Sequence, residues 1–332
     1  MTSMEDSRRS ADAGLIGADL DQHYRMVVRA LQRGRVVPLL GAGANLCDRP
    51  SGHETDTRPW APGQQLPSGA ELSQWLSREF DYPSTDSWNL PRVSQYIDAI
   101  DGDGPLYDSL REAFIGHCEP SSLHHLLADL PTLLGTRENG GRYQLIVTTN
   151  YDDAIERAFH QHDPPEPFDL VVYLAGRRER GHFIHIPPAA EPRLIERPNE
   201  YTELSLRTRT VIMKVHGAVD REDEERDSFV ITEDDYIDFL SRTNLSALVP
   251  APLLAAMFSS HFLFLGYSLH DWNLRVILHR IWSEQTHDYA DWSIQHPVNP
   301  VEQRLWAKRS VDVQDIPLHE YVTELRRRLT AG

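Results

Sequence analysis

Four short polar clusters in this sequence each come directly after an apolar run of the length of a buried strand. They are GAGAN at 41–45, TTNYDD at 148–153, VHG at 215–217 and GYSLHD at 266–271. Such runs are typical of parallel strands buried on both faces, and ligands of open parallel sheets bind beyond the carboxyl ends of the strands. The clusters therefore predict one ligand site built from four strand ends.

The first cluster carries two glycines, Gly41 and Gly43. Glycine lets the backbone approach a pyrophosphate closely, and a helix that begins beyond such a loop supplies N–H donors to an anion. The pattern is shorter than a full GxGxxG, so a tight turn with glycine at positive φ explains it equally well. The chain contains no GxxxxGK[ST] sequence, which argues against a P-loop hydrolase.

Asn150, Asp152 and His216 are the side chains best suited to chemistry. Asn150 and Asp152 precede a helix predicted at Ala154–His160, so they can bind a ligand or simply cap that helix. His216 ends an apolar run and precedes Gly217, which permits a close approach. An imidazole there suits a proton acceptor near neutral pH, and a hydrogen-bonded loop histidine is the alternative.

The elements around these clusters predict an α/β fold, a doubly wound and mostly parallel Rossmann-like sheet with an inserted helical subdomain. Helical patterns alternate with short apolar runs from about residue 21 to residue 329. Pro38 lies inside the first run, 36–40, and argues against a central position for that strand because proline cannot donate to a ladder.

The expected domain organisation is a flexible N-terminal tail at 1–20 and one nucleotide-binding domain at 21–330, with the helical insertion at about 69–140. The stretch 46–68 is rich in proline, glycine and polar residues and is predicted to be a long loop. The stretch Leu245–Tyr267 has the length of a membrane span, but Pro250 and Pro252 interrupt it. A helix followed by a buried strand is expected there instead.

Composition narrows the possible partners and the compartment. The net charge of −17 argues against an extended basic face, so no direct nucleic-acid binding is expected. Cys47 and Cys118 are the only cysteines and form no CxxC pair, which favours a reducing cytoplasm and disfavours a structural zinc site. The histidines at 124, 125, 182 and 185 lack ligand spacing, so packed or solvated side chains are expected and no metal site.

The motifs GAGAN, TTNYD and VHG, in this order, resemble the NAD-binding core of the sirtuin family. VITEDDY at 230–236 and GYSLHDWNLR at 266–275 resemble a bacterial sirtuin-like branch found in anti-phage defence proteins. The resemblance covers roughly Gly34 to Leu329. Each motif is short, and their ordered combination carries the specificity.

The resemblance implies three catalytic residues. Asn150 would order the nicotinamide ribose and a water, and Asp152 would hold the nicotinamide carboxamide. His216 would act as a base toward a ribose hydroxyl or an attacking water.

The resemblance also implies a set of residues that bind NAD. Ala42 and Gly43, with Asn45 in place of the usual serine, would contact the phosphates and the nearby ribose. Gly266 and Ser268 would line the other ribose, whereas Asp271 can instead cap a helix predicted at 273–284. The candidate NAD-binding residues are Gly41, Ala42, Gly43, Asn45, Thr149, Gly266, Ser268 and Asp271.

Two departures from the family pattern bear on the reaction. A protein deacylase of this family carries a four-cysteine zinc ribbon, which two cysteines cannot form. The segment after Gly217, AVDREDEERD, is unlike the part that pairs with an acyl-lysine peptide. Water is then the expected acceptor, and zinc is not expected.

The function expected from these features is hydrolysis of NAD to nicotinamide and ADP-ribose by a cytoplasmic effector of anti-phage defence. Unregulated NAD loss would harm the host, so we expect activation by assembly into a homo-oligomer or by a separate protein, such as a DNA-translocase-type ATPase. The alternatives are a non-hydrolytic module that senses NAD or ADP-ribose, and an NAD-dependent protein deacylase.

Overall fold

The computed structural model describes residues 20–49, 59–116, 118–135, 142–176, 179–241, 245–267, 276, 278–279, 281–282 and 290–331. Within them, nine strands form one sheet in the order β11-β10-β9-β1-β2-β6-β3-β4-β5. Every pairing from β11 to β3 is parallel, and β4 and β5 continue the sheet antiparallel at one edge. The strands are β1 (Val36–Leu40), β2 (Leu145–Thr148), β3 (Phe168–Tyr173), β4 (Phe183–Ile186), β5 (Arg193–Ile195), β6 (Thr210–Lys214), β9 (His261–Leu265), β10 (Asp291–Gln295) and β11 (Val311–Asp315).

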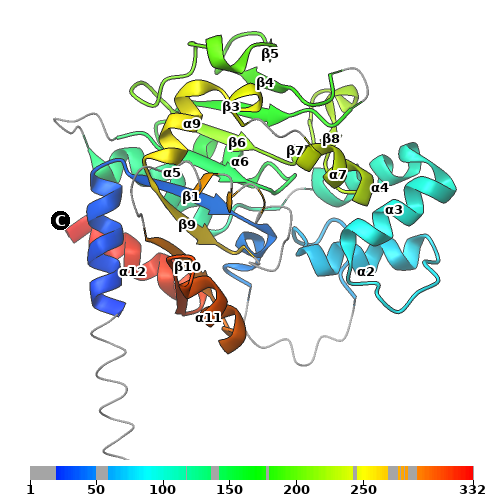
Figure 1. Cartoon of the computed structure of the whole chain (residues 1–332), viewed down its shortest axis with the longest axis horizontal. Helices are drawn as coiled ribbons and strands as arrows, with labels where there is room; N and C mark the ends of the chain where they lie inside the picture. The colour runs from blue at the N-terminus through cyan, green and yellow to red at the C-terminus, as the bar shows by residue number, and fades with distance from the viewer. Residues whose placement is uncertain are drawn as a thin grey trace, which may run out of the picture.

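Helices cover both faces of this sheet, because alternate residues of the central strands are apolar and point to opposite sides. One face packs against the helix at 20–32, α5 (Ser122–Leu134), α6 (Ala154–Gln161) and α12 (Leu318–Ala331). The other face packs against α7 (Glu233–Ser241), α8 (Leu245–Leu248), α9 (Ala251–Phe258) and α11 (Pro300–Ala307). Figure 1 shows the sheet between these layers. The predicted fold class, a doubly wound and mostly parallel α/β sheet, is confirmed.

The strand β1 lies at the centre of the sheet, between β2 and β9, so the expectation drawn from Pro38 is wrong. All five positions of β1 are in register with β9, whereas the register with β2 begins only at Leu39. The carbonyl of Leu40 accepts from the N–H of Thr149, which places the even-numbered residues of β1 on the β2 side. The missing N–H of Pro38 therefore faces β2 and removes one bond of that pairing, whereas the pairing with β9 stays complete.

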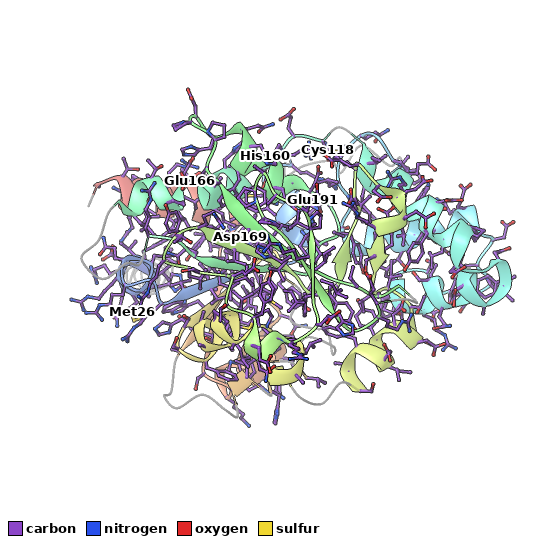
Figure 2. All side chains as sticks on the ribbon, turned by 90° about the horizontal axis from the view of Figure 1, so that it is seen from above. Met26, Cys118, His160, Glu166, Asp169 and Glu191 are labelled. Atoms are coloured by element: carbon purple, nitrogen blue, oxygen red, sulfur yellow. The ribbon has the colours of Figure 1, made fainter. Side chains whose placement is uncertain are left out.

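Three helices lie together at one end of the molecule, beside the carboxyl ends of the strands (Figure 1). They are α2 (Gly69–Glu79), α3 (Leu90–Asp101) and α4 (Asp103–Ile115). Ser68 and Glu71 form a capping box that starts α2, and Asn89 caps α3. Their apolar faces share a cluster with Cys118, which Figure 2 labels, and with residues just beyond β2 and β6.

Two boundaries of the expected domain organisation stay predictions. Within the range 69–140, α2 to α4 have their own apolar cluster, whereas α5 packs on the sheet. The expected tail lies outside the described residues except for Leu20, where the first helix begins.

The stretch Leu245–Tyr267 forms α8, α9 and then β9, as the prolines indicated. In the described part of the chain, no helix has both the length and the apolar character needed to cross a membrane.

Candidate functional site

The four polar clusters follow four neighbouring strands of the sheet, in the order β9-β1-β2-β6. From β1 the chain continues to β2 on one side, and β9 lies on the other side, so the strand order reverses at β1. Open α/β sheets bind ligands at such a reversal, outside the carboxyl ends of the strands. Gly41, Asn150, His216 and Gly266 therefore lie along the edge where a ligand is expected.

The glycines of the first cluster are required by close packing against the chain that leaves β9. A Cβ on Gly41 would lie 2.7 Å from the Cα of Tyr267, and a Cβ on Gly43 would lie 2.6 Å from the carbonyl oxygen of Gly266. Gly41 has φ −117°, and neither glycine is among the described residues with positive φ, so the tight-turn explanation is wrong. Gly266 itself, at φ 62°, has no room for a side chain beside Ala44.

The N–H groups of this loop largely donate within the protein. Gly41 donates to Leu265 at 3.2 Å, Gly43 donates to Gly266 at 2.8 Å, and Ala44 donates to Gly41 at 2.9 Å. The helix expected beyond the loop is a five-residue 3₁₀ helix, η1 (Ala42–Leu46). The loop is therefore tied to β9, and its contact with a pyrophosphate stays a prediction.

Asn150 is held against the β1 loop by its side chain. Its Nδ2 donates to the carbonyl oxygen of Gly41 at 3.2 Å, and its backbone N–H donates to Thr148 Oγ1 at 3.0 Å. A carbonyl can only accept, so this bond fixes which end of the amide faces Gly41. The side chain is 8% exposed, and its Oδ1 is buried with no donor among the residues that the structure describes. Asn150 thus does not cap the following helix.

Asp152 does bond to the start of that helix. Its Oδ1 accepts from the N–H of Ala154 at 3.0 Å, and its Oδ2 accepts from Asn45 Nδ2 at 3.0 Å. The carboxylate therefore turns the NH₂ of Asn45 toward itself. The Oδ1 of Asn45 is then buried without a donor in the described part of the chain. An acceptor oxygen in this place suits a hydroxyl or amide donor better than an anionic phosphate.

Lys214 fixes the turn that carries Asp152, and sequence reasoning missed it. The residue is 0% exposed, and its Nζ donates to the carbonyl of Asp152 and to Glu156 Oε1, the latter at 2.7 Å. Burial raises the pKa of Glu156 and the charge of Lys214 opposes that rise. A lysine within the apolar run TVIMKV was the available signal, because a buried ammonium needs a partner.

His216 lies one strand away from Asn150. Thr148 of β2 is in register with Lys214 of β6, so Asn150 and His216 stand at equivalent positions, each two residues further on. The imidazole is buried, with its ring centroid 5.3 Å from that of Tyr236 and 5.7 Å from that of Phe239, both edge-on. The aromatic rings of α7 thus keep one side of His216 dry.

Gly217 is needed at the start of a closely paired hairpin, and the approach of a ligand there stays a prediction. It has φ 88°, and a Cβ there would lie 2.0 Å from the carbonyl oxygen of Ser228. The hairpin consists of β7 (Gly217–Ala218) and β8 (Ser228–Phe229). It continues beyond the strands, because the N–H of Val230 donates to the carbonyl of His216 at 2.9 Å.

The beginning of α5 clamps the β1 loop from the other side. Ser122 donates from its N–H and its hydroxyl to Asp48, and the hydroxyl of Ser121 lies 3.3 Å from the carbonyl oxygen of Ala44. The Nδ1 of His124 accepts from the N–H of Ser121 at 3.0 Å. Burial lowers the pKa of His124 to about 4, against the opposing charge of Asp152. His124 is therefore a neutral, packed side chain whose single ring proton lies on Nε2.

The remaining candidates are placed as follows. Thr149 donates from its N–H to Leu40 at 3.2 Å and so ties β2 to β1. Ser268 and Asp271 lie outside the described residues, as does most of the helix predicted at 273–284.

His185 has a carboxylate partner, Asp169, which sequence reasoning did not find. Among the described side chains, no group of three or more His, Cys, Asp or Glu is placed to hold a metal ion.

A comparison with known families gives one match. The model of the SIR2-like domain matches residues 144–314, just over half of the chain. The chain belongs to the SIR2-like family. Members of this family are NAD-dependent enzymes, and the matched range contains Asn150, Asp152 and His216. No curated protein matches the sequence.

Proposed function

We propose that this SIR2-like protein is an NAD⁺ hydrolase that cleaves the nicotinamide–ribose bond and releases nicotinamide and ADP-ribose. The observation that carries the proposal is the side chain of Asn150. Its amide is oriented by Gly41, and its buried oxygen has no donor among the described residues, next to the point where the strand order reverses. A buried acceptor left without a protein donor costs free energy, which a bound ligand with a donor would recover.

The open groups near Asn150 match the chemistry of the nicotinamide riboside part of NAD. Asn45 and Asn150 each offer an amide oxygen, and Asp152 adds a carboxylate. Ribose hydroxyls and a carboxamide NH₂ are donors, and the pyridinium ring is a cation. Acceptor groups fixed in a buried site favour positive charge at the ribosyl carbon as the bond breaks.

In the proposed reaction, C1′ of the ribose loses nicotinamide and gains a water oxygen. The electron pair of the C1′–N bond goes to the ring nitrogen, which leaves as neutral nicotinamide. Asn150 accepts from a ribose hydroxyl and orients the water, Asp152 holds the carboxamide, and His216 takes the proton from the water. Holding one water and one leaving group in line is the main task of the site.

Water is the proposed acceptor because the chain lacks the parts of a deacylase. A four-cysteine zinc ribbon cannot form from Cys47 and Cys118, which are buried free thiols. The segment after His216 folds into the β7–β8 hairpin, where Arg111 of α4 bonds to Asp227.

The biological role that we propose is that of a cytoplasmic effector in bacterial anti-phage defence, held weak or silent until activated. Activation would come from assembly into a homo-oligomer or from a separate partner, such as a DNA-translocase-type ATPase. The motifs VITEDDY and GYSLHDWNLR support this role. The net charge of −17 supports a partner, and not this chain, as the part that contacts nucleic acid.

The test is release of nicotinamide from NAD by the full chain, alone, at high protein concentration and with a candidate partner such as a DNA-translocase-type ATPase. We expect His216→Ala to lower turnover by about 10²–10⁴-fold while NAD still binds, because a general base contributes about that much. His160→Ala is the matched control, since His160 is exposed on α6.

The other outcomes separate the competing functions. Nicotinamide released only when an acetylated peptide is present would identify a deacylase. NAD or ADP-ribose binding without release under any condition would identify a sensor module. Wild-type turnover in His216→Ala would remove His216 from the mechanism.

A further inference from the structure

Tyr151 stands between the two proposed catalytic residues of the β2 turn, Asn150 and Asp152. Its ring is buried, and its hydroxyl donates to the carbonyl oxygen of Val230 at 2.8 Å. The N–H of the same Val230 donates to the carbonyl of His216 at 2.9 Å. A single residue therefore separates the Tyr151 hydroxyl from the backbone of His216.

The backbone of Tyr151 contacts the other arm of the same hairpin. Its carbonyl oxygen accepts from the N–H of Val219 at 3.0 Å. Val219 directly follows β7, and Val230 directly follows β8. Tyr151 thus bonds to both arms of the β7–β8 hairpin, to one through its main chain and to the other through its side chain.

Packing fixes the direction of the hydroxyl. The ring of Tyr151 lies edge-on to that of Phe229 on the hairpin, at 5.3 Å between centroids, and to that of Phe114 on α4, at 5.6 Å. These contacts need only the aromatic ring, which phenylalanine would also supply. The hydroxyl adds the bond to Val230.

We propose that the hydroxyl of Tyr151 is a positioning group that holds His216 at a set distance from Asn150. The inference rests on the proposed function for its effect on turnover. Its structural part, that this hydroxyl places His216, can be tested without any reaction.

The experiment compares Tyr151→Phe with Tyr321→Phe in the full chain. Tyr321 on α12 is a matched control, because its buried hydroxyl lies 3.2 Å from His23 Nε2 and the residue is far along the chain from the site. For Tyr151→Phe we expect a kcat for NAD about tenfold lower and a KM within about twofold of wild type, since a small misplacement of a reacting group costs rate more than binding. We also expect shifted ring resonances for His216 and faster amide exchange at Val230. For Tyr321→Phe we expect wild-type kcat and wild-type His216 resonances.

The two hypotheses fail in different ways. If the wild-type chain releases no nicotinamide under activating conditions, the proposed function fails, and the His216 resonances alone decide whether Tyr151 places that ring. If NAD is cleaved and Tyr151→Phe keeps wild-type kcat, the proposed effect on turnover is refuted, and unshifted His216 resonances would refute the placement of His216 as well. A lower unfolding midpoint with unchanged kcat and resonances would make Tyr151 a packing residue only.

Discussion

Two buried polar clusters lie at opposite ends of the sheet and differ in how complete their hydrogen bonds are. At the amino end of β3, Asp169 accepts two bonds from Arg209, both at 3.0 Å, and one contact from His185 at 3.0 Å. The hydroxyl of Tyr201 lies 2.7 Å from the other nitrogen of His185. Asp169, which Figure 2 labels, is fully buried. At the carboxyl end, by contrast, Asn45 and Asn150 each keep an amide oxygen without a donor among the described residues.

The comparison shows that residue types alone do not identify a site. Both clusters contain a carboxylate and other polar side chains, and the amino-end cluster even contains an Asp–His pair. In that cluster every charged group has a partner, so it is built to hold the chain together. Burial by itself would raise the pKa of Asp169, but the bonds from His185 and Arg209 outweigh it and hold that pKa below its usual value. The carboxyl-end cluster is the one that a ligand can complete.

Asp169→Ala, which disrupts the amino-end cluster, should have the largest effect, a loss of stability. Removing the carboxylate leaves Arg209 and His185 without their buried partner, and losing one side of a buried pair costs about 3–5 kcal/mol. Urea unfolding followed by circular dichroism measures this loss. The folded fraction should release nicotinamide at the wild-type rate, and a specific loss of kcat would show that the amino-end cluster also serves the reaction.

Asn150→Ala should instead lower kcat strongly and change the free energy of unfolding little. We expect kcat to fall by about 10²–10³-fold, the typical cost of removing one preorganised group that acts on the transition state. The free energy of unfolding should change by no more than about 1 kcal/mol, because the lost bond to Gly41 is offset by removal of an unsatisfied buried oxygen. A loss of several kcal/mol would place Asn150 with the stabilising residues.

The sheet and the positions of the four clusters were predictable because they follow from local patterns. Parallel strands buried on both faces give continuous apolar runs, and the polar residues that end each run mark the carboxyl edge. Pro38 misled the prediction because its tolerance depends on which neighbouring strand its missing N–H faces, and the chain around Pro38 does not contain that information.

The partners inside the site were not predictable, because they join residues far apart in the chain. Asn45 bonds to Asp152 across 107 positions, and Tyr151 bonds to Val230 across 79. The sequence predicted glycines that let a pyrophosphate approach or that allow a tight turn, whereas Gly41 and Gly43 are needed because another backbone lies against them. Lys214 was the one hidden partner with a local signal, a charge inside a buried run.

The smallest effect that we expect is on the choice of leaving group by the carboxyl-end cluster, and Asp152→Asn tests this choice. Asp152 and the oxygen of Asn45 can accept from a carboxamide NH₂, whereas a carboxylate in its place has no donor and meets a like charge. We therefore expect the wild-type chain to favour NAD over nicotinic acid adenine dinucleotide by about 100-fold or more in kcat/KM.

In Asp152→Asn the new NH₂ would face the NH₂ of Asn45, so Asn45 is expected to turn and present a donor to the ligand. The preference for NAD should then fall by about tenfold, the effect of one polar contact, whatever happens to the absolute rate. Asp153→Asn is the control, because Asp153 bonds to Arg157 and Arg221 and not to Asn45. If the preference is unchanged in Asp152→Asn and falls in Asp153→Asn, the acceptor groups of the carboxyl-end cluster do not face the leaving group. The unsatisfied oxygens of that cluster would then not mark the site of the reaction.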